Sequence, residues 1–242
     1  MNTSNQDYTN LYNLQFRFLK WIQKLDLPFY LTGGTALSRF YLNHRFSDDL
    51  DFFVNSDDRF KDFINVIIRN ISHNFNVNIS DALITDEFCR LFVRENKITL
   101  KIDFVNDVAD RPGKPNSTEF GLIDTVENIL ANKISAIIGR DEPKDVFDLI
   151  FIADNYLFNW ADIFLYAKQK SFLNEIDVEK RLHTFPVEFF TRIKTNNDLP
   201  ALSELKSKLK RISDDFLLGK DNSICNTNTS IYNAKPHSIY ML

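Results

Sequence analysis

The sequence predicts an α+β fold, in which an N-terminal part with a mixed sheet and flanking helices is followed by a helical C-terminal part. Strand-like segments are confined to the first half, whereas apolar residues after about position 125 repeat at intervals of three and four, as in helices. Glycine and proline are scarce, 6 and 7 of 242 residues, which favours regular elements. The chain can bury a sizeable core, and we expect one domain over residues 1–122, a helical domain over 123–218 and a flexible, Asn- and Ser-rich tail over 219–242.

The first elements form a unit of helix, strand, helix and strand. Residues 8–25 place apolar side chains on one helical stripe, and the strand Phe29–Thr32 follows. After Gly33-Gly34 we expect a helix over residues 35–42 and then a strand that contains Asp49 and Asp51. The next helix covers residues 60–71 behind a cap formed by Ser56 and Asp57.

The remaining elements separate into strands and then helices. Three strands are predicted, and the last two form a hairpin across Asn96-Lys97; the strands cover residues 76–80, 89–95 and 98–105. Residues 106–121 contain Pro112-Gly113 and Pro115 and read as a loop, after which Asp124 to Glu127 resemble a capping box. Six helices are predicted beyond it, over residues 125–138, 143–154, 160–170, 175–183, 186–195 and 202–217.

The turn after the first strand combines features that favour a bound anion with features that favour a cation. Gly33 and Gly34 let the backbone bend sharply, and the helix that follows offers free N–H groups and a positive dipole end to a phosphate. Asp49 and Asp51 lie on one face of the next strand, with Cβ atoms roughly 6.6 Å apart, where both carboxylates can approach a hard cation. Alternation in the strand 98–105 adds Asp103 as a candidate third carboxylate. Together these residues suggest a metal-bound nucleoside triphosphate.

Composition and charge exclude several other classes of protein. Cys89 and Cys225 are far apart and the four histidines are scattered, so there is neither a disulfide framework nor a zinc motif, and a catalytic metal would be Mg²⁺ or Mn²⁺ held by oxygen. The first residues are polar, without the basic start and apolar run of a signal peptide, and no stretch reaches the roughly 20 apolar residues of a membrane span. We therefore expect a cytoplasmic protein without a membrane partner. The net charge of −4 means that any nucleic acid must meet a local basic patch.

Charged residues also interrupt apolar helical stripes in the second half. Lys133 lies beside Leu130 and Ile137 and needs either an anionic partner or a path to water. Asp145 and Asp148 are three positions apart on the next helix. The helix dipole is a sufficient structural reason for Asp145, but it is a weaker one for Asp148, whose neighbours are apolar.

Taken together, these residues resemble the polymerase-beta-like nucleotidyltransferases and, among them, the AbiEii/AbiGii toxin family of type IV toxin-antitoxin and phage-resistance systems. The likeness covers roughly residues 29–152, and it rests on the segments Gly33–Leu37 and His44–Phe53, on Asp103, and on Lys133 followed by Lys144–Leu149. Two positions depart from the family pattern: Asn43 stands where the family usually has Gly before His-Arg, and Lys144 stands where it usually has Arg before the later Asp.

The resemblance implies a polymerase-beta-like sheet and magnesium-dependent transfer of a nucleotidyl group, an activity of the EC 2.7.7 type. It implies that Asp49 and Asp51 bind the metal on the triphosphate, and that Asp103 completes a second metal site and helps to deprotonate the acceptor hydroxyl. Lys133 and Asp145 match family positions needed for activity. The implied nucleotide-binding residues are Gly33, Gly34, Thr35, Arg45, Ser47 and Asp148. The family also implies an RNA acceptor such as tRNA, a cognate antitoxin and a role as a toxin or in phage defence.

Two alternatives remain open from the residues. A catalytically silent nucleotide-binding module would keep the fold and act by contact, and an active enzyme could modify a small molecule or a protein side chain in place of RNA. A basic helix could guide an RNA backbone, although such a charge run is more often a solvated helix face; its residues are Lys206, Lys208, Lys210 and Arg211.

Overall fold

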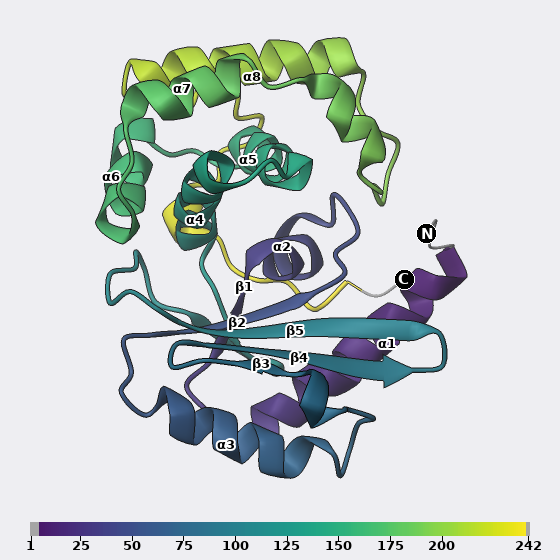
Figure 1. Ribbon diagram of the computed structural model, residues 1–242. Helices are drawn as coiled ribbons and strands as arrows, with labels where there is room; N and C mark the ends of the chain where they lie inside the picture. Colours follow the sequence, from purple (N-terminus) through teal and green to yellow (C-terminus); the bar gives the residue numbers. More distant parts are fainter. Residues whose placement is uncertain (1–4, 241–242) are drawn as a thin grey trace.

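The structure is a computed structural model and describes residues 5–240. A seven-stranded mixed sheet lies between two layers of helices (Figure 1). Helices α1 (Asn5–Ile22) and α3 (Phe60–Ile71) lie on one face of the sheet, and α2 (Gly33–Leu37) and the helical C-terminal part lie on the other. This arrangement confirms the predicted fold class.

The sheet is built from seven strands, and its middle strand follows the glycine turn and α2. The strand order is β3-β4-β5-β2-β1-β7-β6; β2 pairs with β5 and β1 pairs with β7 in parallel, and the other neighbours are antiparallel. The strands are β1 (Tyr30–Thr32), β2 (Leu50–Asn55), β3 (Leu83–Ile84), β4 (Phe88–Glu95), β5 (Ile98–Asp107), β6 (Asn116–Thr118) and β7 (Gly121–Ile123).

The two faces of the sheet differ in chemistry because side chains alternate along each strand. Leu50, Phe52 and Val54 of β2 are buried on the face that α1 and α3 cover. There the ring of Phe52 stacks on Phe104 of β5 with centroids 5.2 Å apart and contacts Phe18 of α1. The opposite face therefore presents the polar side chains of the same strands to the helical part.

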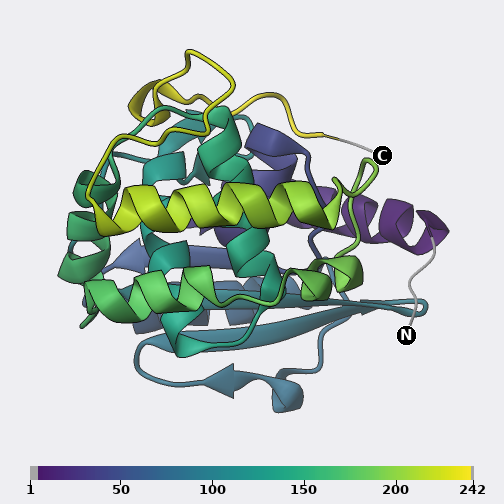
Figure 2. The same ribbon diagram turned by 90° about the horizontal axis from the view of Figure 1, so that it is seen from above.

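Five helices form most of the C-terminal part, and the predicted helices at 160–170, 175–183 and 202–217 are confirmed. These helices are α4 (Val126–Gly139), α5 (Pro143–Asn155), α6 (Trp160–Lys170), α7 (Glu175–His183) and α8 (Leu202–Leu217). Viewed from above, α8 crosses the outer surface of this layer (Figure 2). Within residues 5–240, no helix combines the length and apolar character that a membrane crossing requires.

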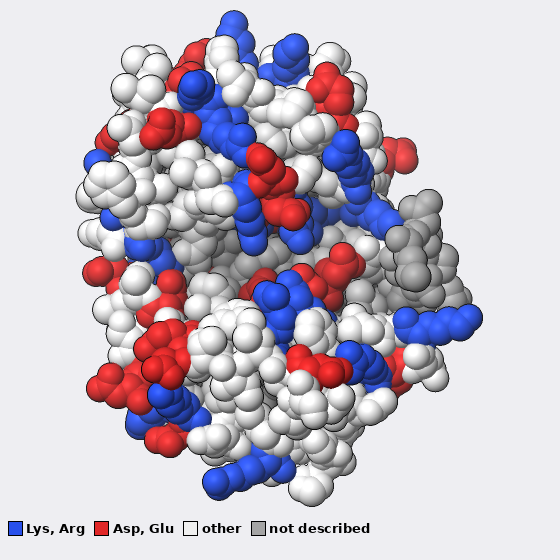
Figure 3. Space-filling view, viewed as in Figure 1, with Lys and Arg blue, Asp and Glu red and all other residues white. Residues whose placement is uncertain are grey.

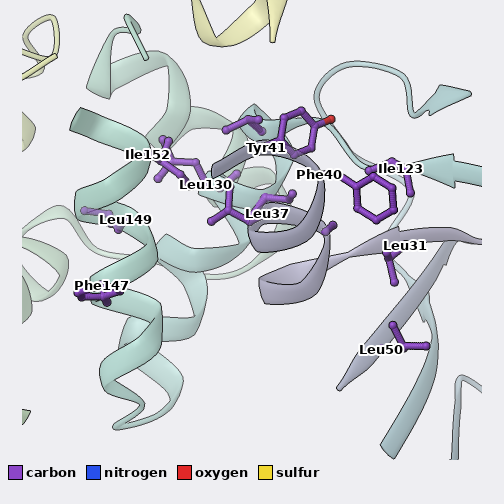
Figure 4. Close-up of a cluster of buried hydrophobic side chains, with 14 of the residues drawn as sticks. Leu31, Leu37, Phe40, Tyr41, Leu50, Ile123, Leu130, Phe147, Leu149 and Ile152 are labelled. Atoms are coloured by element: carbon purple, nitrogen blue, oxygen red, sulfur yellow. The ribbon is translucent and has the colours of Figure 1, made fainter. Parts of the chain in front are cut away.

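Both parts of the chain contribute to one apolar core. Leu37 of α2 lies near Leu130 of α4 and Leu149 of α5, while Leu31 and Ile123 extend the same cluster to the sheet (Figure 4). Burial of these side chains, each worth about 1.5–3 kcal/mol, is what fixes the helical layer over the sheet. The division into domains at residue 122 stays a prediction.

Short irregular elements account for most of the differences from the predicted structure. The segment predicted as a strand over 76–80 forms only an isolated bridge between Val77 and Val93, because the side chain of Asn78 accepts from the backbone N–H of Ser80 and starts a 3₁₀ turn. The helix predicted over 186–195 is the 3₁₀ segment Val187–Arg192. The remaining irregular turns are the 3₁₀ segments Gln23–Leu25, Ile79–Asp81 and Ile231–Asn233 and the π turn Ser38–Leu42.

The predicted loop over residues 106–121 contains part of a hairpin, β6 and β7. Its strands have three residues each, too few for alternation to be visible in the sequence, and Gly121 adopts a φ of +96° where they meet. Helix caps also differ: Thr125, not Asp124, caps α4, and Arg59 occupies the N-cap position of α3 while Asp57 accepts from its backbone N–H.

The segment after α8, where we expect a flexible tail over 219–242, packs on the protein over residues 220–240; residues 241 and 242 lie outside the described chain. The amide of Asn222 donates to the carbonyl oxygens of Ala153 and Tyr156, and Ile231 is buried. Near the end, the backbone N–H of His237 donates to the carbonyl of Phe40, so the chain returns to the turn that follows α2 (Figures 1 and 2). Apolar side chains spaced among the polar residues provide the contacts.

Candidate active site

The glycine turn brings the end of β1 against the carboxylate of Asp51. Gly33 has a φ of +69°, a conformation that favours glycine, and a Cβ atom at this position would lie 2.7 Å from Oδ2 of Asp51. A Cβ atom at Gly34 would overlap the Arg45 guanidinium and approach Oγ of Ser47 to 3.2 Å. Both glycines are therefore needed for close packing at the start of α2.

The segment that follows α2 is held by local hydrogen bonds. Asn43 adopts a φ of +48°, which explains why the family prefers Gly there and why Asn, the residue that best tolerates this region after Gly, can replace it. The hydroxyl of Thr35 donates to the carbonyl of Asp49 and lies 2.8 Å from Oγ of Ser47. The amide of Gln15 donates to the carbonyl of Ser47. Ser47 and Asp49 are thus fixed beside the glycine turn.

The three predicted metal ligands meet on the polar face of the sheet. Asp51 of β2 pairs in register with Asp103 of β5, and Asp49 precedes β2 on the same face. Two basic residues accompany them: Arg90 of β4 donates to both oxygens of Asp103 at 2.7 and 2.8 Å, and Lys101 lies 2.8 Å from Oδ2 of Asp49.

Asp51 is the one member of this carboxylate group that lacks a hydrogen-bond or ion-pair partner among the side chains described for residues 8–240. Burial, followed by repulsion from Asp49 and Asp103, raises its pKa to about 6. With Arg90 and Lys101 in place, no three acidic, histidine or cysteine side chains of the described chain stand close enough to hold a metal. Adjacent oxygen donors that include an unpaired carboxylate fit a hard divalent cation, provided that Arg90 and Lys101 release their partners.

A second charged cluster lies buried behind the glycine turn. Asp148 of α5 is fully buried; Arg45 donates to both of its oxygens at 2.5 and 2.7 Å, and Lys133 lies 2.5 Å from Oδ2. His44 lies 2.8 Å from Oδ1 of the same carboxylate. Burial alone would raise the pKa of Asp148, but the charges of Arg45 and Lys133 outweigh it and hold the pKa well below its usual value.

Asp145 is the second carboxylate of this cluster. Lys133 contacts it at 2.7 Å, and Arg140 donates to both of its oxygens at 2.7 and 3.0 Å. The pKa of Asp145 is lowered, because Lys133 and Arg140 overcome the opposing effect of burial. Lys133 thus has two buried anionic partners, Asp145 and Asp148. They explain how a lysine can lie in the apolar stripe of α4.

These residues border one cleft between the sheet and the helical layer, with a volume of about 610 Å³. Figure 3 shows the hollow across the middle of the molecule, with basic and acidic side chains along its edges. Of the predicted site residues, Thr35, Asp145 and Asp148 lie behind its wall; those that line it are Gly33, Gly34, Arg45, Ser47, Asp49, Asp51, Asp103 and Lys133.

Sequence reasoning missed two groups of residues in the cleft. Counting back from the Asn96-Lys97 turn pairs Arg90 with Asp103, so the hairpin contained the signal for this ion pair. Arg140 and Lys170 also line the cleft, but their contacts depend on helix packing that no local pattern encodes. In the basic helix α8, Lys208 pairs with Asp154 and Glu204, and Arg211 donates to Ser223, so two of its four cations serve internal contacts.

The mixed sheet, the glycine turn and the carboxylates on two parallel strands define the class of the protein as a nucleotidyltransferase. A family model described as nucleotidyl transferase AbiEii toxin, type IV TA system, matches residues 17–221. The chain therefore belongs to the AbiEii nucleotidyltransferase toxin family of type IV toxin-antitoxin systems. This membership implies a nucleotide substrate, a divalent metal and an antitoxin partner.

Solved structures show the same fold. The crystal structure of JHP933 from Helicobacter pylori is 25% identical, with a TM-score of 0.55, and the match covers 90% of this chain and 94% of that chain. MenT4, a nucleotidyltransferase toxin from Mycobacterium tuberculosis, is 15% identical, with a TM-score of 0.52 and coverage of 88% and 84%. No curated protein sequence matches the chain.

Proposed function

We propose that the protein transfers a nucleotidyl group from a nucleoside triphosphate to a hydroxyl of an RNA acceptor, such as tRNA, in a magnesium-dependent reaction of the EC 2.7.7 type. The observation that supports this most directly is the place of Asp51, a partly buried carboxylate without a partner, between Asp49 and Asp103 and against the Gly33 turn. An uncompensated negative charge of this kind favours a cation.

In the proposed reaction, the acceptor hydroxyl oxygen attacks the α-phosphorus and a new phosphorus–oxygen bond forms. The bond between the α-phosphorus and the oxygen that bridges the α- and β-phosphates breaks, and pyrophosphate leaves with the electron pair. Asp49, Asp51 and Asp103 would hold the divalent ions, which supply charge neutralisation at the attacking and leaving oxygens. Asp103 is also placed to take the hydroxyl proton once Arg90 releases it.

The other residues position the triphosphate. The backbone N–H groups at Gly33 and Gly34 and the hydroxyl of Ser47 would donate to phosphate oxygens. Because Asp148 is enclosed by basic partners, we infer that it orients Arg45 and Lys133 and does not contact the nucleotide itself. Lys133 lines the cleft and can direct its remaining ammonium hydrogen to a phosphate.

A transfer assay tests the proposal. Purified protein is incubated with each labelled triphosphate, Mg²⁺ and either total RNA or total protein, and the labelled fraction is identified. We expect label in RNA, and we expect Asp49→Ala and Asp51→Ala to abolish it in proteins that remain folded. Asp86→Ala is the matched control, because this carboxylate lies on the exposed surface beside Lys61.

The outcomes separate the alternatives. Label in protein or in a small molecule would show that the acceptor belongs to another chemical class and would refute the RNA assignment. Triphosphate binding without label in any fraction would favour a silent module. Undiminished transfer by both aspartate variants would refute the active site. An enzyme that draws on triphosphates and RNA would work in the cytoplasm as a toxin, restrained by its antitoxin or released in phage defence.

A further inference from the structure

Beyond the carboxylates, the polar face of the sheet becomes apolar and then polar again. Phe53 follows Asp51 on this face of β2 and lines the cleft, while its register partner Val105 follows Asp103 on β5. Two residues further along β5 lies Asp107, about 13 Å from Asp103 at the usual rise of a strand. The cleft includes both Phe53 and Asp107 and therefore continues past the proposed reaction centre along the sheet, with Phe53 as an apolar part of its floor.

Helix α4 lies across the cleft from this floor. Ile129 and Ala136 line the cleft with Phe53, and Asn132 lies between them along the helix. Helix α6 closes the end with Lys170 and Ser171, and Oγ of Ser171 donates to Oγ of Ser135 at 2.9 Å. We call this end of the cleft the slot; it combines apolar and polar side chains, a lining that suits a ring with hydrogen-bonding edges.

The polar end is organised by the buried ammonium of Lys170, whose side chain is 5% exposed. It donates to Oδ1 of Asn132 at 2.5 Å and to Oδ1 of Asn128 at 3.1 Å, and it forms an ion pair with Asp107 at 2.9 Å. An ammonium cannot accept a hydrogen bond. The oxygen of the Asn132 amide must therefore face Lys170, and this contact fixes which way the amide points.

With Oδ1 held by Lys170, Nδ2 of Asn132 is left as a donor group at the cleft. It has no acceptor among the side chains described, those of residues 8–240, or in the backbone of residues 5–240. The amide of Asn128, in contrast, donates to both oxygens of Asp124 and is used inside the protein. Asn132 is thus a fixed hydrogen-bond donor that awaits an acceptor from a ligand.

We propose that this slot holds the base of the nucleoside triphosphate and that Asn132, oriented by Lys170, discriminates among bases. The inference rests on the proposed function, which places the triphosphate at the Gly33 turn and leaves the sugar and base to extend along the sheet. The base stacks on Phe53, and a carbonyl oxygen or unprotonated ring nitrogen on its edge accepts from Nδ2 of Asn132. Bases that present an N–H group at that position bind less well.

The test measures the binding of all four ribonucleoside triphosphates in Mg²⁺ without an acceptor, so that the readout does not depend on transfer. We expect the wild type to bind one base more tightly than the others. Asn132→Asp keeps an oxygen for Lys170 and exchanges the donor for an acceptor, so the ratio of dissociation constants between the best and the worst base should change by about tenfold. The ratio is the relevant quantity because the added charge repels all four triphosphates equally.

Three further variants make the test specific. Asn70→Asp makes the same change on α3, outside the cleft, and should leave the ratio unchanged. Asn132→Ala removes the donor without adding a charge and should bring the ratio close to one. Phe53→Leu should weaken all four nucleotides by about 5- to 150-fold, as the loss of base stacking predicts, with little change in their order.

The outcomes distinguish the inference from the function on which it rests. Two outcomes overturn the base-reading role alone, provided that transfer persists. In the first, the wild type binds all four bases equally. In the second, Asn132→Asp and Asn132→Ala leave the ratio unchanged. Failure of any triphosphate to bind the folded wild type overturns the proposed function as well. Circular dichroism of each variant verifies the fold.

Discussion

The unpaired carboxylate of Asp51 predicts that the protein without metal becomes more stable when this residue is neutralised. At neutral pH the folded protein must keep Asp51 ionised in a buried position, and repulsion from Asp49 and Asp103 adds to the cost. Asn has nearly the same shape and carries no charge. Asp51→Asn should therefore increase the free energy of unfolding while it abolishes nucleotidyl transfer, a trade between stability and function that is common in active sites.

The structure sets the size and sign of this effect. The pKa of Asp51 rises from 3.8 to about 6, and each pKa unit corresponds to about 1.36 kcal/mol, so the cost has an upper limit of about 3 kcal/mol above pH 6. Because Asp51 is only partly buried, solvent reduces it, and we expect a gain of about 1–3 kcal/mol at pH 8. Since the folded state binds the proton on Asp51 more tightly, the contribution of this residue to stability should rise as the pH falls through 6 and level off near 4.

Urea unfolding in the presence of a chelator, at pH 5 and pH 8, measures both quantities. The difference between Asp51→Asn and the wild type should be about twice as large at pH 8 as at pH 5, because the cost corresponds to about 2.2 pKa units above pH 6 and about 1.2 at pH 5. Asp103→Asn is the matched comparison, because it removes a carboxylate that Arg90 holds with two hydrogen bonds and should not stabilise the protein. The reasoning is refuted if Asp51→Asn is no more stable than the wild type at pH 8, or if it retains the wild-type dependence on pH.

Three other predictions follow from the same region. Asp148→Asn leaves the buried Arg45 without a charged partner and should lower the free energy of unfolding by about 3–5 kcal/mol in urea titrations; a loss below 1 kcal/mol would contradict the buried network. Gly33→Ala places a Cβ atom 2.7 Å from Asp51 in a left-handed conformation and should lower the free energy of unfolding by about 1–3 kcal/mol. It should also weaken triphosphate binding measured by calorimetry; unaltered binding would argue against a phosphate site at the glycine turn. Arg90→Gln releases a carboxylate and should tighten Mn²⁺ binding in the absence of nucleotide, measured by electron paramagnetic resonance; weaker binding would show that Arg90 does not compete with the ion.

The sequence predicted those parts of the fold in which local pattern and tertiary environment agree. Long amphipathic helices such as α6 and α8 were found at their observed bounds, and the hairpin of β4 and β5 followed from alternation around Asn96-Lys97. Elements with three residues per strand, such as β6 and β7, contain too little alternation to detect. Packing of residues 220–240 depends on contacts with helices far away in the chain, which composition does not reveal.

The candidate site shows a similar division. Placing Asp49, Asp51 and Asp103 on one face required only the period of a strand and the assumption that two strands are neighbours, and the register of β2 with β5 brings Asp51 and Asp103 side by side. The contacts of Lys133 and Asp148 could not be derived, because their partners come from different elements. Their resemblance to family positions identified them as important without saying what they touch.

The buried cluster explains why two motifs about a hundred residues apart belong to one site. Arg45 follows the glycine turn and Asp148 lies in α5, 103 positions later, yet the carboxylate accepts two hydrogen bonds from the guanidinium and also contacts Lys133 of α4. Lone buried charges would be costly, so the loop and the helical layer are stable only when these side chains meet. The same contacts hold the loop that contains Ser47 and Asp49 against the glycine turn, because Arg45 and Ser47 are separated by one residue. Residues that resemble catalytic positions thus set the distance between the phosphate cradle and the carboxylates, and a change at Asp148 should disturb catalysis through the loop.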